Sequence, residues 1–82
     1  MTAINKNGDI SIVFSEDEAI VLFEWLHKLN EEERPGLIQD QAEERLLFDL
    51  ESELEKMVSS AFSNNYKELL FKARARIRDK NN

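Results

Sequence analysis

The stretch DQAEERLLFDLESELEKMVSSA, residues 40–61, carries the clearest structural signal in this chain. Its apolar residues recur at spacings of three and four, which is the period of an α-helix with one buried face. Asp40 opens the segment and Glu43 follows three residues later, the pattern of a capping box. We therefore expect a helix over residues 40–60, with this buried stripe: Leu46, Leu47, Leu50, Leu54, Met57, Val58 and Ala61.

A second helix is predicted upstream, over residues 15–30. Ser15 and Glu18 form another capping box, and the acids of the first turn suit the positive end of the helix dipole. Its apolar arc covers more than half of the helix, so it needs two neighbours or leaves an apolar rim exposed. We expect the arc to consist of Ala19, Leu22, Phe23, Trp25, Leu26 and Leu29, with Val21 at its margin.

A third helix is predicted over residues 65–79, with Asn65 and Glu68 forming its cap. Its inward stripe is expected to be Tyr66, Leu70, Ala73 and Ile77, with Leu69 at the edge. Its last turns are rich in bases, which interact favourably with the negative end of the helix dipole. These bases are Lys72, Arg74, Arg76, Arg78 and Lys80.

Residues 1–14 are predicted to be extended. Asn7-Gly8 is a strong signal for a two-residue hairpin turn, and apolar residues alternate along the segment that follows it. A lone hairpin is only marginally stable in water, so we expect this one to lie on the helices. Its inward residues would be Ile10, Ile12 and Phe14.

The predicted fold is therefore mainly α: one three-helix domain over residues 1–82, with a minor N-terminal β strand or hairpin. The chain has no cysteine, which excludes disulfides and thiolate metal sites and is compatible with a reducing cytosol. The N-terminus does not resemble a signal peptide, and the longest apolar run, residues 19–23, is too short to span a membrane. We expect a cytoplasmic protein with no membrane partner.

Charge is divided along the chain. Residues 9–55 contain 15 acids and three bases, whereas residues 56–82 contain seven bases and two acids. The net charge of the whole chain is −6. A strongly acidic surface repels nucleic acid and attracts basic protein surfaces, so the charge pattern predicts a basic protein partner.

The basic C-terminal segment offers a different interpretation, nucleic-acid binding. Arg74, Arg76 and Arg78 form a short run, and Tyr66 and Phe71 are near enough for base stacking. However, bases are common at the end of a helix, and these could pair with acids of the first two helices. Because the acidic segment would repel phosphate, we expect no nucleic-acid partner.

The outward faces of the first two helices hold the candidate partner-binding residues. A rotation of about 100° per residue places the leucines of the second helix on one side and an acidic stripe around an aromatic residue on the other. An apolar anchor ringed by carboxylates suits a basic partner. An alternative is that Phe48 or Ile20 packs under the N-terminal hairpin. The candidates are Glu44, Phe48, Glu51 and Glu55 on the second helix and Asp17, Ile20, Glu24, His27 and Glu31 on the first.

No residue pattern indicates an enzyme. His27 is the only histidine and has no cysteine with which to form a metal site; we expect a partly exposed helix residue, or a contact with a partner. The acid clusters at residues 31–33 and 40–44 do not match the spacing of a calcium loop. The sequence therefore predicts no catalytic residue, no metal, no cofactor and no small-molecule substrate.

Three segments together carry a family resemblance: SEDEAIVLFEWL (15–26), DQAEERLLFDLE (40–51) and NYKELLFKARAR (65–76). They resemble small, acidic, helical bacterial proteins, the immunity proteins of polymorphic toxin systems, including contact-dependent growth inhibition. The resemblance covers residues 15–79 and rests on capping and packing signals, so it transfers no functional residue. It implies a cytosolic protein that neutralises a toxin domain delivered by a sibling cell.

Two hypotheses follow. The first is an immunity protein, or antitoxin, that covers the electropositive substrate groove of a basic toxin, a nuclease above all, with an acidic face. The second is a helical adaptor or regulatory subunit of another bacterial assembly, which would have the same composition without the basic partner.

Overall fold

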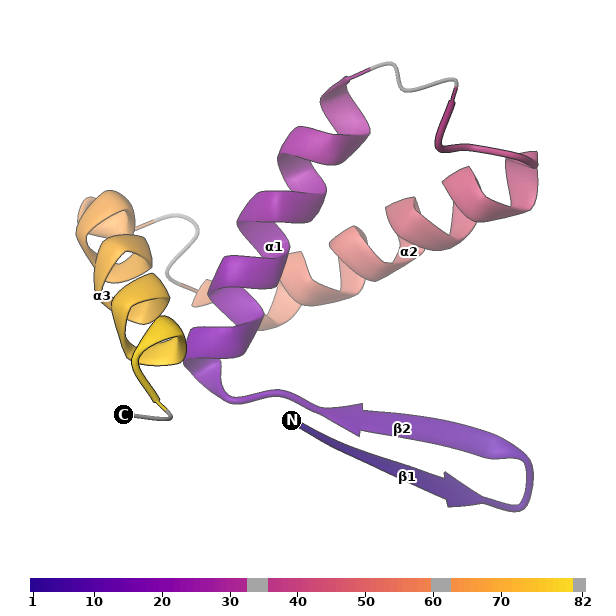
Figure 1. Cartoon of the computed structure of the whole chain (residues 1–82), viewed down its shortest axis with the longest axis horizontal. Coiled ribbons are helices and arrows are strands. Elements are labelled where there is room, and N and C mark those ends of the chain that lie inside the picture. Colours follow the sequence, from indigo (N-terminus) through magenta and orange to yellow (C-terminus); the bar gives the residue numbers. More distant parts are fainter. Residues whose placement is uncertain (33–35, 60–62, 81–82) are drawn as a thin grey trace.

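A computed structural model describes residues 1–32, 36–59 and 63–80, and confirms a mainly α fold with a small N-terminal hairpin (Figure 1). The elements follow in the order β1 (Thr2–Lys6), β2 (Asp9–Val13), α1 (Glu16–Glu31), α2 (Gln41–Met57) and α3 (Tyr66–Arg78). Among the helices of the described residues, none combines the length and the apolar character needed to cross a membrane.

The two predicted capping boxes are present. Ser15 Oγ accepts a hydrogen bond from the Glu18 N–H at 3.1 Å, and a Glu18 carboxylate oxygen accepts one from the Ser15 N–H at 2.8 Å. Asp40 and Glu43 form the same reciprocal arrangement at the start of α2. The predicted cap of α3 is wrong, because Asn65 makes no side-chain capping bond; instead the Ser63 hydroxyl accepts a hydrogen bond from the Asn65 N–H at 3.1 Å.

The hairpin turn is as predicted, but the position of the hairpin is not. Asn7 and Gly8 both have positive φ, 55° and 90°, as a tight two-residue turn between antiparallel strands requires. The strand residues are all exposed, including Ile10 and Ile12, which were expected to point into the core. Only Phe14, next to α1, packs partly against the core. Alternation identifies an apolar face of a strand, but it does not determine what covers that face.

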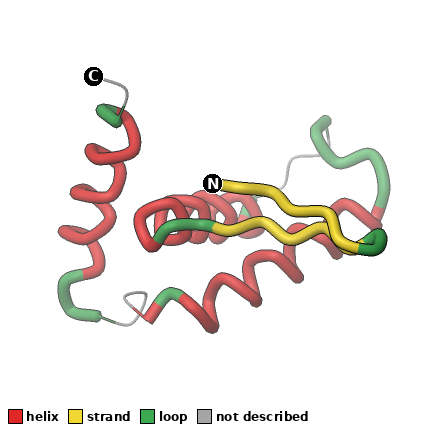
Figure 2. The backbone as a smooth tube through the Cα atoms, turned by 90° about the horizontal axis from the view of Figure 1, so that it is seen from below, coloured by secondary structure: helices red, strands yellow, loops and turns green. Residues whose placement is uncertain are grey.

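Helix α1 is the central element of the fold. It packs against both α2 and α3, which diverge from each other, and Figure 2 shows α3 standing crosswise to α1. The buried core lies where α1 meets its two neighbours and is small. It consists of Ile20, Phe23, Leu26, Leu54, Val58, Leu70 and Ala73.

The inward face of α1 differs from the prediction at two positions. Ile20, assigned to the partner-binding face, is only 4% exposed and belongs to the core, whereas Trp25, assigned to the core, is 57% exposed. The apolar arc of this helix is so wide that the sequence does not define its centre. Helices α2 and α3 both approach the side that carries Ile20 and Phe23, and this leaves Trp25 at an apolar rim.

Helix α2 is also rotated relative to the prediction. Leu54 and Val58 are buried and Leu47 is partly buried, but three members of the predicted stripe are exposed: Leu46 (69%), Leu50 (36%) and Met57 (75%). The reason is that α1 covers only one edge of the broad apolar face of α2. Ala61 lies outside the described residues. In α3, Leu70 and Ala73 are buried as predicted, and Tyr66 and Ile77 are partly buried.

Candidate protein-binding site

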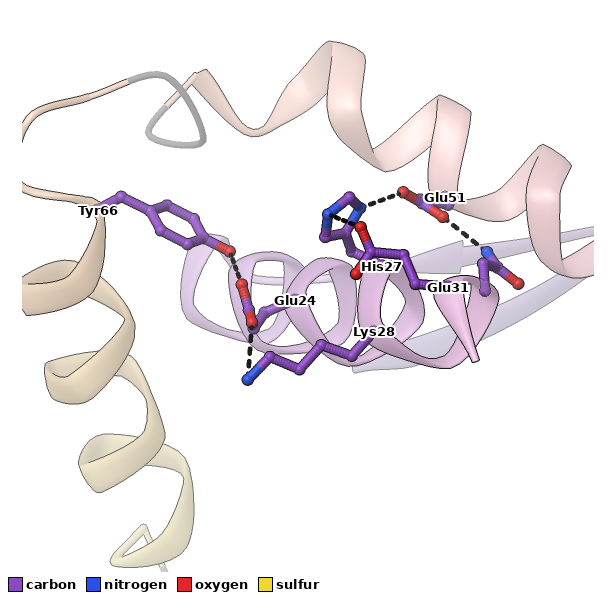
Figure 3. Close-up of polar contacts among 7 residues, drawn as sticks. Glu24, His27, Lys28, Glu31, Glu51 and Tyr66 are labelled. Carbon is purple, nitrogen blue, oxygen red and sulfur yellow. Dashed lines mark hydrogen bonds and ion pairs between the residues drawn. The ribbon is translucent and has the colours of Figure 1, made fainter. Parts of the chain in front are cut away.

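Several predicted partner-binding residues instead join the helices to one another (Figure 3). His27 of α1 lies between two carboxylates: its Nδ1 is 2.9 Å from Oε2 of Glu51 on α2, and its Nε2 is 3.1 Å from Oε1 of Glu31. Asn30 donates a hydrogen bond to the other Glu51 oxygen at 2.6 Å. These contacts fix the C-terminal half of α1 against α2.

The charges of this cluster shift its pKa values. The hydrogen bond to Glu51 and the nearby carboxylates raise the pKa of His27. Partial burial works against ionisation of Glu51, but the hydrogen bonds from Asn30 and His27 outweigh it and lower the Glu51 pKa. The pair is therefore favoured in its charged form, an imidazolium facing a carboxylate.

Two other acids of α1 contact α3. The Tyr66 hydroxyl donates to Oε1 of Glu24 at 2.8 Å, and burial together with this bond raises the tyrosine pKa. Arg76 donates from Nε and Nη2 to the two oxygens of Asp17, at 2.7 and 2.8 Å, which lowers the Asp17 pKa. This contact confirms, for Arg76, the prediction that C-terminal bases pair with acids of the earlier helices.

The acidic stripe of α2 is divided by the fold. Glu51 is turned toward α1, whereas Glu44 and Glu55 are exposed and form no ion pair with another described residue. Phe48 is 53% exposed and lines the same pocket as Leu37 and Ile38, which precede α2. It does not pack under the hairpin, so that alternative for Phe48 is wrong.

Phe48 lines a groove between the C-terminal half of α1 and the N-terminal half of α2. The groove has a volume of about 640 Å³. Its wall is apolar and contains Trp25, Leu29, Leu37, Ile38, Leu47 and Phe48, and we call it the Trp25–Phe48 groove. Its polar residues are Asn30, Glu31, Glu32 and Glu44, so the described lining contains three acids and no base.

Sequence reasoning found Phe48, Glu44 and Glu31 but missed most of the apolar wall. Trp25 was assigned to the core, and Leu37 and Ile38 were not assigned at all. The signal available was the apolar pair Leu37-Ile38, which directly follows Pro35-Gly36 in the sequence. That signal becomes informative only when α1 and α2 are known to spread apart toward the loop that joins them (Figure 1).

Among residues 1–32, 36–59 and 63–80, no group of three histidine, aspartate or glutamate side chains is placed to hold a metal ion. Both ring nitrogens of His27 face carboxylates, those of Glu51 and Glu31. Comparisons with protein-family models, with curated proteins and with solved structures found no match to this chain.

Proposed function

We propose that this protein is a non-catalytic immunity protein, an antitoxin that acts in the cytoplasm by binding a basic toxin domain. The observation that carries this proposal is the Trp25–Phe48 groove, an apolar cleft between two aromatic side chains, in which the charged residues of the described lining are all acidic. The acidic balance of the chain and its resemblance to immunity proteins support the same function.

The groove has the composition of a protein-binding hot spot. Such sites have an apolar centre that excludes water, surrounded by polar groups that select the partner. An apolar side chain of the toxin would enter between Trp25 and Phe48, and its lysines or arginines would approach Glu31 and Glu44. At a net charge of −6, the protein would also attract a basic partner over distances of about 10 Å, which increases the association rate.

A nuclease is the basic toxin that this surface suits best, because its substrate groove is built to accept a row of phosphates. Glu44 and Glu55 are eleven residues apart on one side of α2. With a rise of about 1.5 Å per residue, that separation is about 16 Å, similar to the length of about five phosphates along one strand of a duplex. The two carboxylates would take the places of phosphates at the two ends of that stretch.

The second candidate is a helical adaptor or regulatory subunit. It is favoured by the exposed hairpin, whose two strands have free edges that could pair with a strand of another protein. Gene neighbourhood distinguishes the two candidates. A toxin-domain gene directly upstream favours an immunity protein, and a metabolic operon favours an adaptor.

Co-expression tests the proposal. The gene product encoded beside this chain should stop growth when it is produced alone, and growth should recover when this protein is produced with it. If the neighbouring product is harmless, or remains toxic although this protein is present and soluble, the immunity function is wrong.

A further inference from the structure

The two long walls of the Trp25–Phe48 groove are helices. Figure 1 shows that α1 and α2 lie close together toward the C-terminal end of α2 and spread apart toward the loop that joins them. Each wall presents two side chains one turn apart on the same side of its helix: Trp25 and Leu29 on α1, and Glu44 and Phe48 on α2. Such rows of side chains leave a groove into which the ridge of a further helix can pack.

The size of the groove matches a short helical segment. Trp25 and Glu32, at the two ends of the α1 wall, are separated by about 10 Å at about 1.5 Å per residue, which is about two turns of a helix. A helix about 10 Å across occupies about 420 Å³ per turn. The groove volume of about 640 Å³ therefore corresponds to about one and a half turns.

An extended segment would fit this groove less well than a helix. Its backbone N–H and C=O groups would need partners, whereas both helical walls bond their own backbone groups within the helix. In the described lining, only Trp25 and Asn30 carry side-chain donors, and the Asn30 amide already donates to Glu51 and to the Leu47 carbonyl. A helix satisfies its backbone internally, so its apolar side chains can enter the groove without burying unpaired polar groups.

Acids stand on both walls of the groove. Glu31 lies on α1 and Glu44 on α2, and the described lining contains no base. The contact between Glu31 and His27 involves Oε1 of the carboxylate. Arg45, which follows Glu44 in the chain, is not in the described lining, and its Nε lies 3.4 Å from Oδ1 of Asp49. An occupant with bases on both sides of its apolar stripe would therefore match the groove in charge.

We propose that the Trp25–Phe48 groove binds an amphipathic helix of the partner. Two apolar residues four positions apart on that helix are seated between Trp25 and Phe48, and a lysine or arginine on each flank faces Glu31 or Glu44. About two turns of the partner helix lie in the groove. This inference rests on the proposed function, because it names the part of the basic toxin domain that enters the groove.

The single tryptophan of the chain makes occupancy of the groove measurable. Trp25 is 57% exposed, so its fluorescence emission should move to shorter wavelength when an apolar partner covers the indole. The probe is an alanine-rich synthetic peptide of about 15 residues without aromatic side chains, with leucines at helical spacing and lysines on both flanks of that stripe. On mixing, circular dichroism should show more helix than the sum of the two separate components.

Two altered peptides test the form and the charge of the occupant. A peptide with proline at its centre keeps the leucines and lysines but cannot continue the helix, so it should bind at least about tenfold more weakly. A peptide with glutamates in place of the lysines should not shift the emission, because its charges would be repelled by Glu31 and Glu44.

Two protein variants test the place of binding. Phe48→Ala should weaken binding of the helical peptide about tenfold, and its circular dichroism should show that it remains folded. The matched control is Phe71→Ala on α3, an aromatic truncation outside the described lining of the groove, which should bind the peptide like wild type.

Several results would overturn the inference: no response of Trp25 to the helical peptide, equal binding of the proline peptide, or equal affinities for Phe48→Ala and Phe71→Ala. A mass above 9.6 kDa in light scattering, with Trp25 emission that changes on dilution, would show that a second copy fills the groove and would also overturn it. Because the titration requires no toxin, it separates the two proposals. Growth rescue without peptide binding contradicts only the helical occupant, and peptide binding beside a harmless neighbouring product contradicts only the immunity function.

Discussion

His27 of α1 and Glu51 of α2 are joined by a 2.9 Å contact between Nδ1 and Oε2, which links the two helices that contribute walls to the Trp25–Phe48 groove. Asn30, which donates to the same carboxylate, lines the groove itself. The helical pattern of the sequence predicted that His27 and Glu51 would face a partner. In the structure they contact each other across the interface between α1 and α2.

The His27–Glu51 pair predicts a pH dependence of stability. Because the folded state raises the pKa of His27 above its ordinary value of 6.5, the stabilisation is complete below pH 6.5 and is lost as pH rises through the folded-state pKa. The free energy of unfolding should therefore decrease as the pH rises above about 6.5. His27→Gln should lack this component in urea titrations across that range. An identical pH profile for variant and wild type would contradict the proposed coupling.

The core predicts which truncations unfold the protein. Leu54 is buried against α1, so Leu54→Ala should lower the free energy of unfolding by about 2 to 5 kcal/mol, a large part of the stability of so small a domain. Phe71→Ala, an aromatic truncation at a 72% exposed site, should change it by about 0.5 kcal/mol or less. Thermal melts monitored by circular dichroism compare the two variants. Similar melting temperatures for the two variants would mean that Leu54 does not lie on the buried face of α2.

The hairpin should unfold without the helices. Gly8 has a φ of 90°, so Gly8→Ala strains the turn although no atom would obstruct the new Cβ. Nuclear Overhauser contacts across the strands, such as Ala3 to Ile12, should weaken or vanish while the helical melting temperature stays unchanged. The control is Gly36→Ala, because a Cβ at Gly36 would also meet no atom and Gly36 does not have a positive φ. This variant should change neither the cross-strand contacts nor the melting temperature. A large drop in melting temperature for Gly8→Ala would show that the hairpin supports the core.

The sequence predicted the element types well because those signals are local. Two capping boxes, the Asn7-Gly8 turn and the three apolar periodicities each depend on residues a few positions apart. The rotation of the helices could not be predicted in the same way. The apolar faces of α1 and α2 are wider than one contact requires, and only the arrangement in space decides that Ile20 is buried and Leu46 is not.

The candidate site could be predicted only in part, because the sequence does not give the arrangement of the helices in space. Phe48 and Glu44 are identifiable from the pattern of α2 alone, because they lie opposite its leucines. Glu24 and Asp17 have the same kind of pattern, yet each contacts a residue of α3 that is 42 or 59 positions away in the chain. Pairing over such separations cannot be inferred from helical periodicity.

The acidic lining of the groove predicts an effect on association kinetics. Glu44→Lys should slow binding of a basic toxin domain and weaken the dependence of the association rate on salt, because long-range attraction is reduced. Glu68→Lys on α3 makes the same change in net charge away from the groove and should have a smaller effect. Stopped-flow association rates at several ionic strengths measure the difference. Equal rates for the two variants would mean that net charge alone, and not the groove, guides the partner.

The most direct test of the binding site compares the affinities of Phe48→Ala and Phe71→Ala for the neighbouring toxin domain. Phe48 is a half-exposed wall of the groove, so its truncation should weaken binding by roughly 2 kcal/mol, about 30-fold, mainly through faster dissociation, with little change in melting temperature. Phe71→Ala should bind like wild type. Wild-type affinity for a folded Phe48→Ala variant in calorimetric titration would contradict the assignment of this groove as the toxin-binding site.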